Sequence, residues 1–244
     1  MQLLGTKWEE IFKNKKMLFA YLMKKSPKFI YKVNIVFMIA KFRKCNRITL
    51  VDMIKIYLED ISTIDSEAKF NAYFDKLPKY RQEKILALKN KNDKYLSLLA
   101  GRLLCDGLRD LGLYNCINKI VVDENGKPYI PDNPIYFSIS HSGTKAMVVF
   151  SGNEVGCDIQ IMKKNAISLA DKYFTKEEQD EIKNSDDPLK TFFKLWTLKE
   201  CYMKSSGKGL SLGLKNIDVY NTDYISKCYV IDQNYMVSYI ARDR

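Results

Sequence analysis

Helical and strand patterns alternate twice along this chain, and this alternation constrains the fold more than any other feature. A long helical pattern begins at Asn92 and stops at Gly112, and several strand patterns follow it. A second helical pattern over residues 188–206 is again followed by strand patterns. Helices and antiparallel hairpins in this order are typical of an α+β fold. The sequence predicts two α+β subdomains, residues 53–152 and 153–244.

Shorter patterns predict the remaining elements. They are strands at 53–58, 119–123, 135–140, 146–151 and 154–161, a helix at 78–91, and strands at 219–220, 228–231 and 236–241. Asn125-Gly126 is a hairpin signal between the strands at 119–123 and 135–140. Residues 175–178 (Thr-Lys-Glu-Glu) have the form of a capping box that opens a helix.

The positive charge of the chain is concentrated at its N-terminus. The formal net charge is +11, and residues 1–48 hold twelve Lys and Arg against two Glu, so this segment carries +10 and the remainder only +1. The apolar stretch over 29–42 is too short to span a bilayer. We expect a basic extension over residues 1–52, with an amphipathic membrane-surface helix within 1–48 as the less favoured alternative. The nearly neutral body gives no indication of nucleic-acid binding.

Cysteine and histidine usage excludes several kinds of site. Six cysteines show neither a C-x-x-C pair nor a metal-ligand spacing, and we expect reduced structural thiols in a cytoplasmic protein. His141 is the single histidine, which excludes a His-rich zinc site. A Ser-His-Asp hydrolase would need this same histidine, and the chain contains neither a G-x-S-x-G nor a P-loop motif.

A carboxylate and an amide share one face of the strand predicted at 154–161. Side chains alternate along a strand, so Asp158 and Gln160 point one way while Cys157 and Ile159 face the core. Oxygen ligands of this kind suit a hard cation such as Mg²⁺. A lone Asp on a strand is more often structural, so this pair is weak evidence when taken by itself.

Two further segments carry polar side chains at informative spacings. On the helix over 188–206, Trp196, Glu200 and Lys204 follow one another every four residues and lie on one face, which runs into a Gly-Lys-Gly turn. The alternative reading is a surface Glu–Lys pair of small energetic consequence. Ser140 and Ser142 flank His141 at a strand end, where their hydroxyl groups can bind a phosphate.

Together these motifs resemble the Sfp-type 4′-phosphopantetheinyl transferases, whose signature is G-(I/V)-D-(I/V)-E followed by W-(S/T)-x-K-E-(A/S)-x-x-K-x-x-G-x-G-L. Residues 156–160 and 196–210 match these two motifs, and residues 126–128 and 140–142 match two upstream motifs of the family. The resemblance covers residues 53–220. It implies a pseudo-twofold pair of α+β subdomains with the active site in the cleft between them.

The resemblance also implies residue roles. Asp158 and Glu200 are similar to metal ligands, with Gln160 where a glutamate is usual, and the implied ion is Mg²⁺. The residues implied to bind coenzyme A are Lys127, Pro128, Ser140 and His141 at the 3′-phosphate, Lys204 at the pyrophosphate, and Arg81 and Lys84 near the adenosine. Leu96 stands where the family has an arginine.

The implied reaction transfers 4′-phosphopantetheine from coenzyme A to a serine of an apo acyl or peptidyl carrier protein and releases 3′,5′-ADP. Glu200, or a metal-bound water beside it, is the implied general base, with Lys204 and Asp158 as its catalytic partners. A monomer without a nucleic-acid partner is expected. Gln160 and Leu96 keep an alternative open, namely a catalytically weak relative that binds coenzyme A or a carrier protein without transfer. The kind of carrier also stays open.

Overall fold

The computed structural model describes residues 35–38, 53–132, 135–207, 213–220 and 223–243. Every element below belongs to the unit Lys32–Arg244. The less favoured alternative of a membrane-surface helix within residues 1–48 and the Gly-Lys-Gly turn that begins at Gly207 lie largely outside the described residues. No helix among the described residues is long and apolar enough to cross a membrane.

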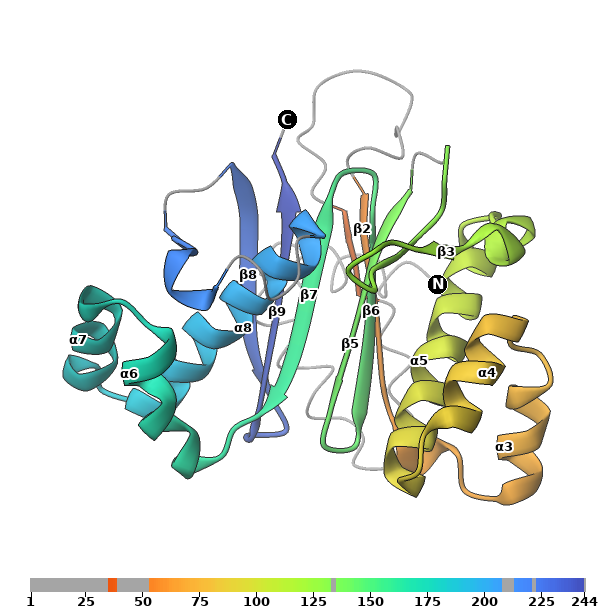
Figure 1. Ribbon diagram of the computed structural model, residues 1–244, viewed down its shortest axis with the longest axis horizontal. Coiled ribbons are helices and arrows are strands. Elements are labelled where there is room, and N and C mark those ends of the chain that lie inside the picture. Colours follow the sequence, from red (N-terminus) through yellow and green to blue (C-terminus); the bar gives the residue numbers. More distant parts are fainter. Residues whose placement is uncertain (1–34, 39–52, 133–134, 208–212, 221–222, 244) are drawn as a thin grey trace, which may run out of the picture. The chain divides into compact units, whose positions relative to one another are not determined.

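The first sheet has four antiparallel strands in the order β1-β2-β6-β5 (Figure 1). These strands are β1 (Ile35–Met38), β2 (Met53–Asp60), β5 (Tyr136–Ser142) and β6 (Lys145–Ser151). The helices α3 (Glu67–Phe74), α4 (Lys79–Ala87) and α5 (Lys91–Asp110) lie together on one side of this sheet (Figure 1). Strand β1, which pairs with β2, lies inside the range expected for the extension.

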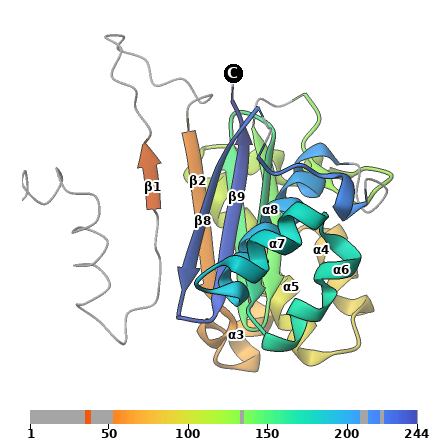
Figure 2. The same cartoon turned by 90° about the vertical axis from the view of Figure 1, so that its left-hand side faces the viewer.

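The second sheet has three antiparallel strands in the order β7-β9-β8. They are β7 (Val155–Ile161), β8 (Tyr224–Ile231) and β9 (Tyr235–Arg242), and the helices of this half are α6 (Ala170–Tyr173), α7 (Lys176–Asn184) and α8 (Pro188–Ser206). Figure 2 shows these helices in front of the sheet formed by β7, β8 and β9. The described part of the chain is thus a mixed α+β structure with antiparallel sheets, as the sequence predicts.

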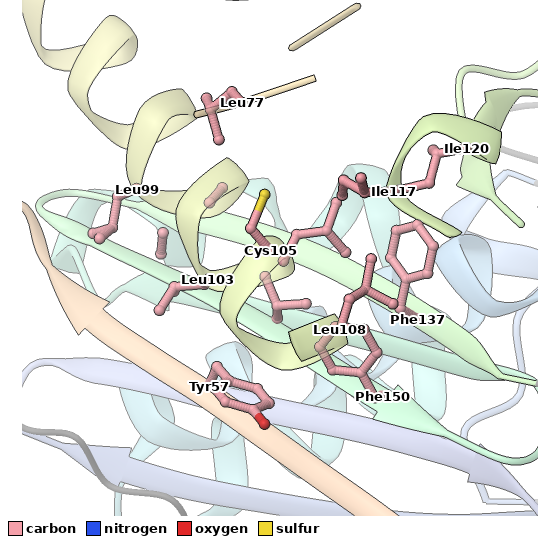
Figure 3. Packing of buried hydrophobic residues seen from close by; sticks show 14 of the residues in the cluster. Tyr57, Leu77, Leu99, Leu103, Cys105, Leu108, Ile117, Ile120, Phe137 and Phe150 are labelled. Carbon is pink, nitrogen blue, oxygen red and sulfur yellow. The ribbon is translucent and has the colours of Figure 1, made fainter. Parts of the chain in front are cut away.

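Burial on both faces of β6 explains how the layers are stacked. Ala146, Val148 and Phe150 belong to the core beneath helix α5, where Phe150 lies near Leu108 (Figure 3). Met147 and Val149 alternate with them and pack against β7 and β9 of the second sheet. A strand that is covered on both faces must be apolar at every position, which accounts for the continuous run of apolar residues from 146 to 150.

The structure corrects several predicted boundaries. Helix α5 is capped by Asn90 and not by Asn92, because the Asn90 side chain accepts hydrogen bonds from the backbone N–H groups of Asn92 and Asp93. The Asn125-Gly126 turn joins β3 (Val121–Val122) to the short strand β4 (Pro128–Tyr129) and not to the strand near 135–140. Val219 and Tyr220 lie outside any strand, and helix α3 was not predicted.

Both predicted signals at the ends of helices are confirmed. Thr175 and Glu178 form the reciprocal hydrogen bonds of a capping box at the start of α7. Helix α8 spans Pro188–Ser206 and ends at Gly207, whose φ of 68° is left-handed and favours glycine.

Candidate active site

Gly156 allows strand β7 and helix α8 to approach each other closely. A Cβ atom at this position would overlap the Cys201 carbonyl oxygen and lie 3.0 Å from the backbone nitrogen of Ser205. The hydroxyl groups of Thr197 on α8 and Ser238 on β9 are 2.6 Å apart on the same helix–sheet interface. These contacts hold α8 in a defined register against the strand that carries Asp158.

Asp158 is at the centre of the polar side chains gathered at this interface. It is 1% exposed, and its Oδ1 accepts hydrogen bonds from Ser140 Oγ at 2.6 Å and from Lys204 Nζ at 2.6 Å. Lys204 Nζ also donates to Ser140 Oγ at 3.0 Å. The structure therefore brings three predicted site residues together from β5, β7 and α8.

Glu200 and Trp196 lie one and two helical turns before Lys204 on α8. Burial raises the pKa of the Glu200 carboxyl group, the Asp158 charge raises it further, and Lys204 opposes the shift. The carboxylates of Asp158 and Glu200 and the ammonium group of Lys204 therefore influence one another electrostatically. The Trp196 ring contacts Tyr173 edge to face at 5.3 Å and stacks on Phe192 at 5.9 Å, so its ring is part of an aromatic cluster.

Gln160 follows Asp158 on β7 and is half-buried. Its Oε1 accepts a hydrogen bond from Ser142 Oγ at 3.2 Å. Cys157 and Ile159 are fully buried between the two sheets, which confirms the predicted alternation of faces along this strand.

Positive charges from both halves of the fold act on His141. Desolvation lowers the pKa of His141, and the positive charges of Lys204, Lys84 and Arg81 lower it further. Arg81 is 4% exposed and donates to the Ser97 carbonyl oxygen at 2.6 Å. Its Nε is buried and finds no hydrogen-bond partner among the described residues. An anion would neutralise this concentration of positive charge.

Lys127 lies at the C-terminal end of helix α8. Its Nζ donates to the Ser205 carbonyl oxygen at 2.6 Å, a favourable position for a cation because the last carbonyl groups of a helix carry partial negative charge. Pro128 follows it in β4. Leu96 is 3% exposed on α5, so the position where the family has an arginine is a core position in this chain.

The donor atoms around Asp158 fit a hard divalent cation. Its Oδ2 is buried and has no hydrogen-bond partner among the described residues, although buried polar atoms almost always have one. A carboxylate oxygen beside a second acid and an amide oxygen is suitable for Mg²⁺. The described residues contain no cluster of three His, Cys, Asp or Glu side chains that could hold a metal. Mg²⁺ is commonly held by one or two carboxylates together with other oxygen ligands, which the Gln160 amide can supply.

Lys199 has a structural contact that its sequence motif did not reveal. It is fully buried, and its Nζ is bonded to Glu178 Oε1 at 2.8 Å and to the carbonyl oxygens of Leu214 at 2.9 Å and Ile217 at 2.7 Å. A lysine on the buried face of an amphipathic helix is the only signal in the sequence that points to such a role. These bonds hold the segment after α8 against the helix.

Comparison with known proteins supports the resemblance seen in the sequence. The family model of the 4′-phosphopantetheinyl transferase superfamily matches residues 154–241. The chain is 30% identical to 4′-phosphopantetheinyl transferase ffp of Bacillus subtilis over 179 residues, which cover 66% of this chain and 80% of the relative.

Two further relatives match shorter stretches. The chain is 34% identical to Sfp of Bacillus subtilis (strain 168) over 57% of this chain and 64% of Sfp. It is 32% identical to gsp of Aneurinibacillus migulanus over 60% of this chain and 63% of gsp. The chain thus spans somewhat less than two thirds of these two relatives and four fifths of ffp. On this evidence the chain belongs to the Sfp-type 4′-phosphopantetheinyl transferase family.

Proposed function

We propose that this enzyme transfers the 4′-phosphopantetheine group of coenzyme A to a serine of an apo acyl or peptidyl carrier protein. The serine oxygen forms a bond to the β-phosphorus of coenzyme A, and the bond from this phosphorus to the bridging oxygen breaks. The products are the holo carrier protein and 3′,5′-ADP. Family membership supports this reaction. The observation that carries the site assignment is the buried Asp158 Oδ2, which has no hydrogen-bond partner within the part of the chain that the structure describes.

Glu200 is the proposed general base that takes the proton from the serine hydroxyl. Its raised pKa supports this role, because a carboxylate of higher pKa accepts a proton more readily. Asp158 lies close enough to influence that pKa, so both acids act at one reaction centre.

Asp158, Gln160 and Glu200 are the proposed ligands of Mg²⁺. The bound ion would neutralise the negative charge of the pyrophosphate oxygens during transfer. Lys204, whose pKa is raised by the Asp158 charge despite its burial, stays protonated and is proposed to bind the same pyrophosphate.

The cationic side chains around His141 are proposed to bind the 3′-phosphate of coenzyme A. Arg81 and Lys84 influence the pKa of His141 and are proposed to lie at the adenosine end. Lys127 and Pro128 are proposed to contribute from the end of α8, because Lys127 bonds to Ser205 one residue after Lys204. Ser140, which the resemblance also assigns to coenzyme A, is hydrogen-bonded to Asp158 and Lys204.

The proposed domain arrangement has a basic extension over residues 1–52 and two pseudo-twofold halves, 53–152 and 153–244, with the site in the cleft between them. Each half pairs one sheet with one long helix, α5 in the first and α8 in the second, which supports the proposed symmetry. We propose a monomeric cytoplasmic enzyme.

Mass spectrometry of a carrier protein tests the proposed function directly. The full chain is incubated with Mg²⁺, coenzyme A and an apo acyl or peptidyl carrier, and the expected product is heavier by one phosphopantetheine group. A carrier whose acceptor serine is replaced by alanine is the matched control. Coenzyme A binding without any mass change on several carriers would support the alternative of a relative that binds without transfer.

A further inference from the structure

Strands β5 and β7 are joined by a row of serine side chains. Ser138, Ser140 and Ser142 alternate along β5 on one face, and their hydroxyl oxygens accept hydrogen bonds from every second backbone N–H of β7. The distances are 3.0 Å from Cys157 N, 3.3 Å from Ile159 N and 3.1 Å from Ile161 N. Side-chain oxygens thus take the place of backbone carbonyl groups between the edges of two sheets.

Two of these serines also hold the side chains of the proposed metal ligands. Ser140 accepts from Ile159 N and donates to Asp158 Oδ1 at 2.6 Å. Ser142 repeats this geometry two residues later, since it accepts from Ile161 N and donates to Gln160 Oε1 at 3.2 Å. Each hydroxyl group is therefore bonded to the backbone after a ligand residue and to the side chain of that residue.

The hydrogen bonds of Ser140 leave its hydroxyl group no freedom. A hydroxyl group has one hydrogen to donate and two lone pairs. Ser140 Oγ donates to Asp158 and accepts from Ile159 N and from Lys204 Nζ. Because Oδ1 of Asp158 is held in this way, the oxygen left for a cation is Oδ2.

The hydrogen bond from Ser142 to Gln160 fixes which end of the glutamine amide faces the hydroxyl group. A glutamine amide has an oxygen end and a nitrogen end, and only the oxygen can bind a hard cation. The Ser142 hydroxyl donates to Oε1 and thereby selects one of the two orientations of the amide. A glutamate needs no such selection, because its two oxygens are equivalent.

We propose that Ser142 is a positioning residue that orients the Gln160 amide oxygen toward the metal, so that glutamine can serve where the family usually has glutamate. Ser140 acts differently on Asp158, since it holds Oδ1 and leaves Oδ2 for the cation. This inference rests on the proposed function, and it explains how the site tolerates the loss of one negative charge at position 160.

A double-mutant cycle on the full chain tests the proposal. Mn²⁺ binding is measured by the electron paramagnetic resonance signal of free Mn²⁺, and Mg²⁺ half-saturation of carrier modification is measured in parallel. Outer contacts to metal ligands are typically worth about tenfold in affinity or more, so S142A should weaken Mn²⁺ binding about tenfold in the wild-type background. In the Q160E background S142A should weaken Mn²⁺ binding by less than about threefold. The difference between the two backgrounds measures the coupling between positions 142 and 160.

Ser138 provides the matched control. It makes the same kind of bond to β7 at Cys157 N, and S138A should leave Mn²⁺ binding unchanged if orientation of ligands is what matters. Equal effects of S142A in both backgrounds, or equal effects of S142A and S138A, would overturn the proposal, because a general loss of strand contact predicts both. If Q160A and D158A bind Mn²⁺ as tightly as the wild type does, the proposed metal ligands are wrong. That result would contradict the proposed function and is distinguishable from a failure of the Ser142 proposal alone.

Discussion

Asp158 on β7 and Lys204 on α8 form a partly buried hydrogen-bonded ion pair, with 2.6 Å between Oδ1 and Nζ. Ser140 from β5 completes the contact, so three elements far apart in the sequence meet at one carboxylate. The ammonium group faces the oxygen that is already hydrogen-bonded, and the second oxygen is left without a partner among the described residues. The predictions below follow from this arrangement.

Replacement of Glu200 by glutamine should reduce kcat by more than about tenfold, because the proposed base is lost. The melting temperature should change little, since removal of a carboxylate whose pKa is raised by burial relieves an unfavourable charge. Carrier modification and thermal unfolding are the two measurements. A variant that keeps most of the wild-type kcat would exclude the base role.

The pH dependence of kcat should reflect the raised pKa of Glu200. Glu200 must be ionised to accept a proton, and its pKa is raised above the ordinary value of 4.5 by burial and by Asp158. Activity should therefore fall as the pH drops through this raised value. NMR titration of labelled glutamate checks the assignment.

In Lys204→Met the pKa of Glu200 should rise further, because the opposing positive charge is gone. A downward shift of this pKa would contradict the proximity of Glu200 and Lys204.

Replacement of Gln160 by glutamate should lower the Mg²⁺ concentration needed for half-maximal activity, since a charged ligand binds a hard cation more tightly. The measurement is a magnesium titration of both proteins at saturating coenzyme A. An unchanged or higher half-saturation in the variant would show that position 160 does not face the metal.

His141→Ala and Lys127→Ala should respond differently to dephospho-coenzyme A, which lacks the 3′-phosphate. The loss caused by His141→Ala should appear mainly in KM for coenzyme A and should largely vanish with the dephospho substrate. The loss caused by Lys127→Ala should vanish only in part with the dephospho substrate, because Lys127 also holds the end of α8 through Ser205. Identical behaviour of the two variants would show that the contact between Lys127 and Ser205 contributes nothing to activity.

Gly156→Ala should destabilise the protein by more than about 2 kcal/mol, because the added methyl group overlaps the backbone of Cys201. Gly112→Asn is a suitable control: nothing lies within 4 Å of its Cβ position, and asparagine tolerates the positive φ. Chemical denaturation measures both. Equal stability of the two variants would mean that α8 and β7 are packed less closely than described.

Deletion of residues 1–34 and of residues 1–52 separates two contributions of the N-terminal segment. Both truncated proteins should keep their activity, because none of the proposed site residues lies before Arg81. The shorter deletion retains β1, whereas the longer one exposes the edge of β2 and should aggregate more readily. Light scattering and activity measure this difference. Liposome co-sedimentation of the full chain tests the membrane alternative, and lipid binding that vanishes on truncation would support it.

The sequence by itself determined most of the long elements and the identity of the polar residues, but it did not predict β1, β4 or α3. Local signals sufficed for the capping box at Thr175 and for α8 and its stop at Gly207, since these depend on hydrogen bonds and backbone angles within a few residues. The alternation of Asp158 with Cys157 also follows from strand geometry alone. Local signals failed where several residues compete, as at Asn90 and Asn92, both of which are acceptable helix caps.

Only the tertiary structure decided which of these residues meet. The sequence places Ser140 next to His141, and neighbours on a strand point to opposite faces. Only the structure shows that the Ser140 hydroxyl group contacts Asp158. The role of the serine row along β5 could not be predicted from the sequence, because its hydrogen-bond partners are on β7. Likewise, the burial that raises the pKa of Glu200 arises from the packing of α8 on β7, which depends on contacts between residues more than forty positions apart. The same packing buries Asp158 Oδ2, which has no hydrogen-bond partner among the residues that the structure describes.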